Sequence, residues 1–137
     1  MPVRRVRNPF RKPPIREKRA LTDEERRLGR WMLEHGEPDA RAFLPQLDRA
    51  RVVSRCPCGC ATIELEVDGF APVKDAGLEV LGDFWCQDGD DTNGIFIYRY
   101  GDVLGGIEVY GLSGDAPKAL PAPGMLHPME AVFGDPE

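Results

Sequence analysis

Three cysteines separated by single residues are the sharpest chemical signal in this sequence, in the run Cys56-Pro57-Cys58-Gly59-Cys60. Proline and glycine favour a tight turn, which would point the three thiol groups toward one centre. Four thiolates hold a structural zinc ion tetrahedrally, and Cys86 is the fourth cysteine of the chain. Zinc knuckles usually place two residues between paired cysteines, and here there is one. The zinc hypothesis names as ligands Cys56, Cys58, Cys60 and Cys86.

The same cysteines have two other interpretations. Reduced thiols serve as small apolar side chains in protein cores, and closely spaced thiols support redox chemistry. The N-terminus is charged but lacks the apolar segment of a signal peptide, and no apolar run is long enough to span a bilayer. We therefore expect a cytoplasmic protein without membrane association, in which the cysteines stay reduced and form no disulfide framework.

Other patterns that could carry chemistry are weaker. Asp88, Asp90 and Asp91 suggest a calcium loop, but position 6 of that loop would be Asn93 and position 12 would be Arg99, where glycine and glutamate are required. An acidic loop between two strands is the better interpretation. The sequence contains no Ser-His-Asp spacing, no phosphate-binding loop and no zinc-protease motif. This favours a protein that is not an enzyme and has no cofactor other than the zinc considered above. An enzyme stays open as an alternative, because a site assembled from residues far apart in the sequence shows no local motif.

Charge is divided unevenly along the chain. Residues 1–20 carry eight basic side chains and one acidic side chain, whereas the rest of the chain carries 10 basic and 22 acidic groups, for a net charge of -5. Four prolines and little apolar periodicity in residues 1–20 predict a disordered basic arm. Such an arm solubilises the chain, binds nucleic acid, or lies on the acidic body of this chain or of a copy.

The first predicted helix covers residues 22–35. Thr22 and Glu25 have the spacing of a capping box, in which each side chain binds the other's backbone N–H. Leu28, Trp31 and Met32 form an apolar stripe, and Gly36 would end the helix as a left-handed C-terminal residue. A second, shorter helix begins near residue 38 and is broken into two turns by a proline at position 45.

The apolar pattern then changes to a period of two residues, which predicts strands. The turn Gly101-Asp102 joins the two strongest strands as a hairpin, because glycine adopts the positive φ that a type II′ turn requires. Pairing Tyr100 with Val103 at the turn would set Tyr98 opposite Gly105, so that an aromatic ring covers a glycine. The predicted strands span residues 51–55, 61–67, 78–86, 94–100 and 103–110, and the buried face of the last two would carry Phe96, Tyr98, Ile107 and Val109.

Helices followed by strands predict an α+β fold, with N-terminal helices packed on a mainly antiparallel sheet. At 137 residues, with 42% hydrophobic and 30% charged residues, the chain fits one globular domain. We expect a basic arm over 1–20, an α+β domain over 21–110, and a Pro/Gly-rich tail over 111–137 that packs on the domain.

Two stretches of the chain, LGRWMLEHG over 28–36 and FLPQLDRARVVSRCPCGCATIELEV over 43–67, resemble a group of small bacterial proteins of unknown function. That group shares a helical start, a Cys-Gly-Cys hairpin and a later strand pair ending in a motif like Ile107-Glu108-Val109-Tyr110. The resemblance covers most of the chain outside the arm and tail. It implies the same fold and brings no activity with it.

Three functions follow as expectations. The missing catalytic constellation, the mixed polarity of one sheet face and the segregated charge favour a non-enzymatic module that binds a protein partner. The first alternative is a small zinc protein that uses the cysteine hairpin. The second is nucleic-acid binding through residues 1–20, against which the acidic body counts.

Overall fold

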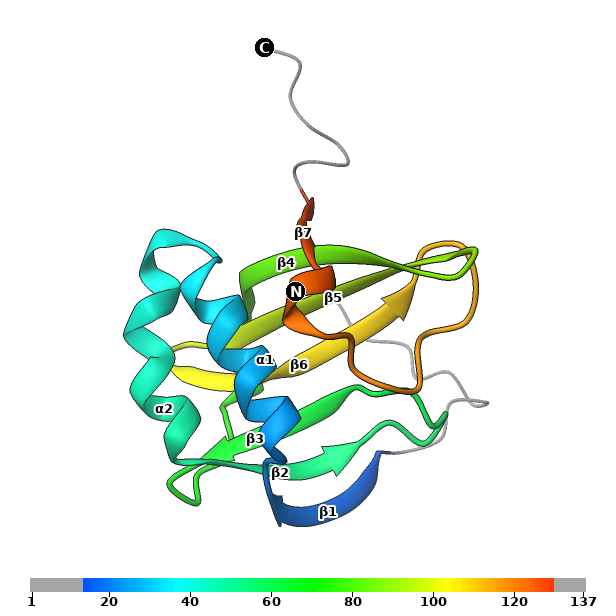
Figure 1. Ribbon diagram of the computed structural model, residues 1–137. Helices are drawn as coiled ribbons and strands as arrows, with labels where there is room; N and C mark the ends of the chain where they lie inside the picture. The colour runs from blue at the N-terminus through cyan, green and yellow to red at the C-terminus, as the bar shows by residue number, and fades with distance from the viewer. Residues whose placement is uncertain (1–13, 130–137) are drawn as a thin grey trace, which may run out of the picture.

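A computed structural model of the protein describes residues 14–129, in which seven strands form one sheet (Figure 1). The order across the sheet is β1-β2-β3-β6-β5-β4-β7, and every neighbouring pair is antiparallel. The predicted α+β class and antiparallel sheet are confirmed. The elements are β1 (Ile15–Ala20), α1 (Asp23–Glu34), α2 (Leu44–Asp48), β2 (Ala50–Arg55), β3 (Ile63–Val67), β4 (Leu78–Asp88), β5 (Asp91–Tyr100), β6 (Val103–Gly111) and β7 (His127–Pro128).

Strand β1 corrects the expected disordered arm. Residues 15–20 pair with β2, from Ile15 opposite Arg55 to Ala20 opposite Arg51. Their alternating charges suit an edge strand, where charged side chains discourage pairing with other chains. Residues 1–13 of the predicted arm lie outside the described residues, and nucleic-acid binding through the arm stays a prediction. A truncation that tests it should end at residue 13, because a longer one removes a strand.

Helix α1 begins as predicted. The Thr22 hydroxyl accepts a hydrogen bond from the Glu25 N–H at 3.0 Å, and Thr22 N–H donates to the Glu25 carboxylate at 2.8 Å, which completes the capping box. The helix end differs from the expectation, because the φ of Gly36 is not positive. A Cβ at Gly36 would lie 2.2 Å from the carbonyl oxygen of Leu81. Glycine is required there because the chain passes directly against β4.

The second helical segment divides as expected. A 3-10 helix over Pro38–Phe43 leads into α2, which carries Pro45 in its first turn, where a missing N–H costs no hydrogen bond. Figure 1 shows α1 and α2 across one face of the sheet. The buried core joins apolar side chains from both helices and from strands β2 to β6, among them Leu28, Met32, Leu47, Val52, Leu65, Phe84, Ile97 and Ile107.

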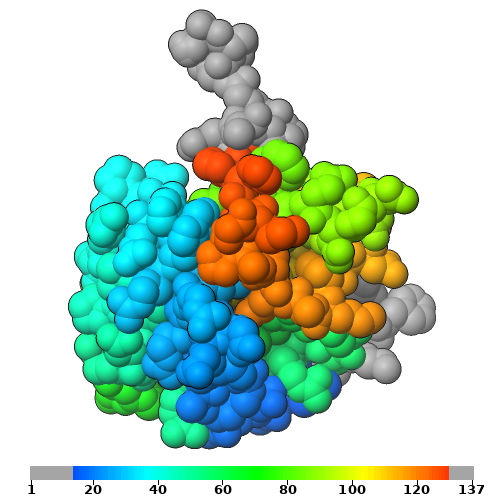
Figure 2. All heavy atoms as spheres, viewed as in Figure 1, coloured from blue at the N-terminus to red at the C-terminus, as the bar shows by residue number. Residues whose placement is uncertain are grey.

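The segment that follows β6 crosses the surface beside α1 (orange in Figure 2). Leu126 is 6% exposed in the core, and Leu120 packs against the core, whereas Met125 is exposed. The part of the predicted tail after residue 129 lies outside the described residues. No helix within residues 14–129 is long and apolar enough to cross a membrane.

The β5–β6 hairpin turns at Gly101 as predicted, with φ 59° at that glycine and Tyr100 opposite Val103. Its predicted register is wrong beyond the first two pairs. A bulge shifts the pairing, so that Tyr98 faces Gly106 and Ile97 faces Ile107.

The cause of the shift is the pair of adjacent glycines. The Tyr98 side chain covers both: a Cβ at Gly105 would lie 2.6 Å from its ring, and one at Gly106 would lie 2.6 Å from its hydroxyl oxygen. Because of the bulge, the β5 side chains buried in the core are the neighbours of Phe96 and not the predicted Phe96 itself. Ile95, Ile97, Ile107 and Val109 lie in the core cluster, and Phe96 is only half-buried.

Candidate metal centre

The cysteine run forms the turn between β2 and β3, as its position between two predicted strands indicated. Gly59 N–H donates to the Cys56 carbonyl at 3.2 Å, and Cys56 N–H donates to the Thr62 carbonyl at 3.4 Å. Gly59 has φ 91°, a conformation that side-chain-bearing residues rarely adopt. The turn therefore curls back on itself within five residues.

This curl brings three sulfur atoms together. The Sγ atoms of Cys56, Cys58 and Cys60 all lie within 4.8 Å of one another. Those of Cys56 and Cys58 are 3.0 Å apart. Three thiolates bound to one zinc ion at about 2.3 Å would have sulfurs roughly 3.8 Å apart. Small side-chain rotations from the present positions would accommodate such an ion.

Cys56 and Cys58 differ in their readiness to lose a proton. The pKa of Cys58 is lowered by a hydrogen bond from the Cys56 thiol, by the Cys60 N–H at 3.4 Å and by the positive charge of Lys118. Burial and the neighbouring Cys58 raise the pKa of Cys56 to about 11. Cys58 is also the most exposed of the three. Of these two thiols, Cys58 at the outer corner of the cluster loses its proton more readily than Cys56 behind it.

The fourth predicted ligand, Cys86, does not join this group. It lies in β4 opposite Asn93 and is 3% exposed in the core. Strands β6 and β5 separate β4 from β3, so three steps of about 4.8 Å place Cys86 roughly 14 Å away across the sheet. Its burial matches the interpretation of a cysteine as a small apolar residue. The sequence could not have separated it from the other three, because its position depends on the strand order.

The aspartates considered for calcium occupy the tight turn between β4 and β5. Asp88 pairs with Asp91, and Gly89 between them has φ 61°. The structure thus places them in a strand-connecting loop, as the failed calcium motif indicated. Within residues 14–129, the cysteine cluster is the group of at least three Cys, His, Asp or Glu side chains that converge closely enough to hold a metal ion.

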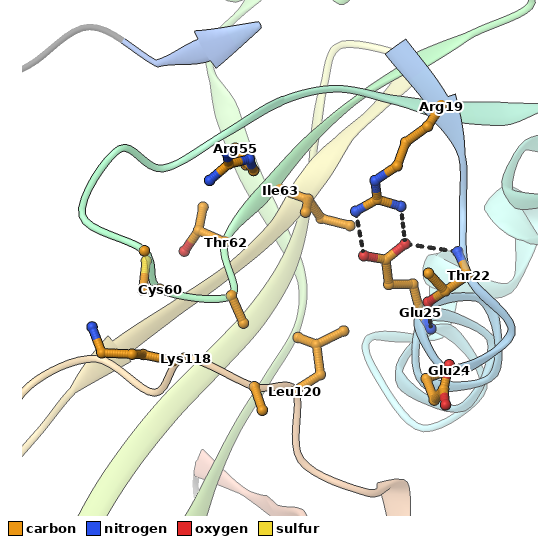
Figure 3. A pocket seen from close by; sticks show the side chains of 13 residues that line it. Arg19, Thr22, Glu24, Glu25, Arg55, Cys60, Thr62, Ile63, Lys118 and Leu120 are labelled. Atoms are coloured by element: carbon orange, nitrogen blue, oxygen red, sulfur yellow. Dashed lines mark hydrogen bonds and ion pairs between the residues drawn. The ribbon is translucent and has the colours of Figure 1, made fainter. Parts of the chain in front are cut away.

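A groove of about 540 Å³ opens beside the cysteine turn (Figure 3). Cys60 belongs both to the sulfur cluster and to the groove wall. Lys118 lies on the same side as Cys60, and the first turn of α1 faces them from the opposite side. Ile63 and Leu120 give the groove an apolar part.

The segment that carries Lys118 is held against the turn by the backbone. Ala61 N–H donates to the Pro117 carbonyl at 2.9 Å, so residues 117 and 118 lie beside the cysteines although almost 60 positions separate them in the sequence. The Lys118 Nζ lies 3.7 Å from the place that a Cβ on Gly59 would occupy. Sequence patterns gave no signal for this lysine, because it follows a proline in an irregular segment.

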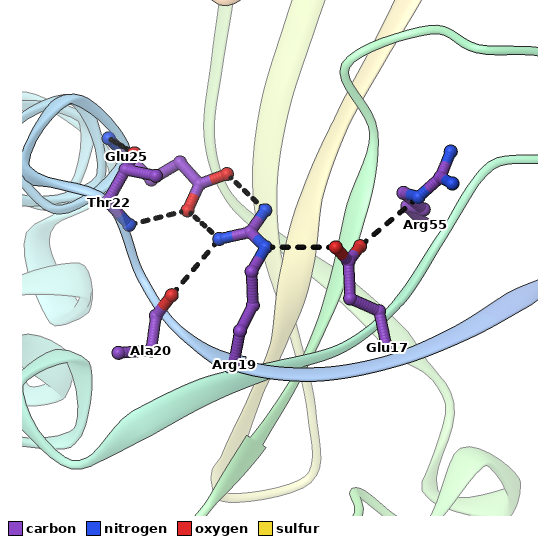
Figure 4. Close-up of polar contacts among 6 residues, drawn as sticks. All are labelled: Glu17, Arg19, Ala20, Thr22, Glu25 and Arg55. Atoms are coloured by element: carbon purple, nitrogen blue, oxygen red, sulfur yellow. Dashed lines mark hydrogen bonds and ion pairs between the residues drawn. The ribbon is translucent and has the colours of Figure 1, made fainter.

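On the opposite wall of the groove, Arg19 and Glu25 belong to an ion-pair network that extends to Glu17 and Arg55 (Figure 4). Arg19 binds Glu25 through two hydrogen bonds of 2.8 Å, and its Nε lies 3.3 Å from Glu17. Glu17 in turn lies 3.2 Å from the Nε of Arg55. The charges of Arg19, Glu17 and Glu25 are therefore largely satisfied within the protein.

Comparisons of this chain with protein-family models, with curated proteins and with solved structures find no match in any of the three. The expected resemblance to a group of small bacterial proteins gains no support from them.

Proposed function

We propose that the protein binds a soft divalent metal ion, zinc in the first instance, through Cys56, Cys58 and Cys60. The convergence of three Sγ atoms within 4.8 Å in one turn carries this proposal. Thiolates are preferred ligands of zinc, and all three of the proposed protein ligands are thiolates.

The metal would close the end of the β2–β3 hairpin. Its three ligands lie within five residues, so the ion would fix the turn without tying distant parts of the chain together. A zinc ion held by three protein ligands keeps its fourth position for a water molecule or an added ligand. The site is therefore suited to exchange of that ligand, which distinguishes it from the closed four-cysteine site expected from the sequence.

Metal titration of the reduced full chain tests the proposal. Cobalt is the probe, because Co²⁺ bound to thiolates absorbs strongly in the near ultraviolet, and zinc should then displace it at about one ion per chain. Cys58→Ser should weaken binding by at least about tenfold, because it removes one of three ligands. Cys86→Ser is the matched control and should leave the stoichiometry unchanged. Absence of thiolate absorption, or loss of binding only in the Cys86 variant, would refute the proposal.

A protein-interaction role is the second candidate, and the connection between β3 and β4 favours it. Phe70 is 73% exposed and Val73 is 67% exposed, and large apolar side chains this open are suited to contact a partner. A chain with Phe70→Ser and Val73→Ser should keep its unfolding midpoint but lose partners that the wild-type chain retains from its native host. Identical sets of retained proteins for the two chains would exclude this surface.

A further inference from the structure

The groove and the sulfur cluster share one residue, Cys60, so a metal ion held by the three cysteines would lie at the groove's edge. At about 540 Å³ the groove falls within the range of small-molecule sites, which is about 300 to 1,000 Å³. A ligand in this groove could therefore reach the open position of the metal.

Two cations of the groove wall are available to an anion. Lys118 forms no ion pair with any residue among 14–129, and it is exposed beside Gly59. Arg55 contacts Glu17 through its Nε at 3.2 Å, and its side chain is 46% exposed. The other cation, Arg19, is held by Glu25 and Glu17. A carboxylate entering the groove would meet Lys118 and Arg55 close to the cysteine turn.

We infer, on the basis of the proposed metal site, that the groove takes a small thiol bearing a carboxylate. Its sulfur would fill the fourth position on the metal, and its carboxylate would pair with Lys118 and Arg55. A fourth thiolate completes the all-sulfur donor set that zinc favours, and cationic donors bind carboxylates strongly. The carbon chain between the two groups would lie against Leu120.

Binding of this ligand is an exchange without oxidation or reduction. The metal–sulfur bond forms as the metal–water bond breaks. The proton of the thiol passes to the solvent, and the water molecule leaves the groove.

Three small thiols test the inference on the Co²⁺-loaded full chain. The probes are 3-mercaptopropionate, 2-mercaptoethanol and cysteamine, which present a thiol beside a negative, a neutral and a positive group. Changes in the cobalt spectrum report binding of each. We expect 3-mercaptopropionate to bind about tenfold more tightly than 2-mercaptoethanol at low salt, and cysteamine to bind least. The preference for the anion should shrink as salt is added.

Two charge variants separate the contribution of the groove's cations to the binding preference from the contribution of each thiol's own basicity. Lys118→Gln and Arg55→Gln should each reduce the preference for 3-mercaptopropionate several-fold. The preference is measured on variants saturated with Co²⁺, because Lys118 also lowers the pKa of Cys58 and its loss weakens metal binding itself. Lys74→Gln is the control, because that lysine contacts Glu64 and does not line the groove. Equal preferences in wild type and both groove variants, with cobalt bound, would overturn the inference alone. Failure of cobalt to bind at all would instead overturn the proposed function.

Discussion

The guanidinium group of Arg19 donates two hydrogen bonds of 2.8 Å to the carboxylate of Glu25, joining the edge strand β1 to the first turn of α1. The same carboxylate accepts the Thr22 N–H that completes the capping box. One side chain thus caps the helix and anchors the strand. The spacing of Thr22 and Glu25 predicts the cap, but the partner from β1 depends on how the strand folds back.

The first prediction concerns the pH dependence of this pair. Burial alone would raise the pKa of Glu25, but the hydrogen bonds from Arg19 and Thr22 outweigh it, so the pKa falls below its ordinary value of 4.5. A lowered pKa in the folded state contributes stability at pH values above 4.5, and this stability is lost as the pH falls through the folded-state pKa.

Urea unfolding of the wild type and Glu25→Gln, measured between pH 7 and pH 3, checks this. The wild type should lose more stability than the variant as the pH falls below about 4.5. Arg19→Gln removes the hydrogen-bond donor, and it should likewise reduce the loss of unfolding free energy between pH 7 and pH 3. Parallel profiles for all three proteins would show that the pair contributes no pH-dependent stability.

The second prediction concerns Gly36, which passes against β4. Gly36→Ala would bring a Cβ to 2.2 Å from the Leu81 carbonyl oxygen and 2.9 Å from that of Met32, both backbone atoms that cannot rotate away. We expect a loss of about 2–4 kcal/mol in unfolding free energy, as for other steric and backbone defects.

Gly124→Ala is the matched control for this change. No atom lies within 4 Å of a Cβ at Gly124, and its φ is not positive, so this variant should be neutral or slightly more stable. A loss for Gly36→Ala no larger than for Gly124→Ala would contradict the close approach of the chain to β4.

Local signals predicted much of the fold. The capping box marks the start of α1, Gly101-Asp102 marks a hairpin turn, and both depend on residues close in sequence. The pairings between strands that are not joined by a hairpin depend instead on residues far apart in the sequence. Nothing in the alternation of β3 and β6 shows that Ile63 pairs with Ile107, which lies 44 positions away. The edge strand β1 was missed because its charged residues gave no apolar alternation.

In the candidate site too, the features that depend on neighbouring residues were predictable and those that depend on distant residues were not. The turn chemistry around Cys56, Cys58 and Cys60 predicts that their thiols converge, because five residues with proline and glycine leave few conformations. The exclusion of Cys86 follows from the strand order. The groove depends on the backbone contact between Ala61 and Pro117, which no sequence pattern indicated.

The third prediction tests the register of the β5–β6 hairpin. Ile97 and Ile107 face each other, and both side chains are 0% exposed. Ile97→Ala and Ile107→Ala should each lower the unfolding free energy by about 2–5 kcal/mol. In the uninterrupted register expected from the sequence, Ile97 would lie on the opposite face from Ile107, and its replacement would cost much less.

Val80→Ala is the control in this series, because that side chain is 39% exposed and the change should cost about 0.5 kcal/mol or less. The double variant of Ile97 and Ile107 should depart from additivity, since the two side chains are direct neighbours. A loss at Ile97 no greater than at Val80 would show that the bulge at Gly105 and Gly106 does not form.

The last prediction concerns the order in which the cysteines of the reduced, metal-free protein react with iodoacetamide. The thiolate is the reactive form, so reactivity follows exposure and pKa. Cys58 is exposed and its pKa is lowered by hydrogen bonds from Cys56 and the Cys60 N–H, whereas the pKa of Cys56 is raised to about 11. At pH 7.5 Cys58 should therefore be alkylated at least about tenfold faster than Cys56, because the thiolate fraction falls tenfold for each unit of pKa. Cys86, 3% exposed, should react only on unfolding. Peptide mass spectrometry over a time course measures all four sites in one sample.

Added zinc should protect Cys58 and leave the rate at Cys86 unchanged, so that protection separates metal binding from a general stabilisation of the fold. Equal rates at Cys56 and Cys58 without metal would contradict the hydrogen bonding within the cluster, and unchanged labelling of Cys58 in excess zinc would count against a metal ion there.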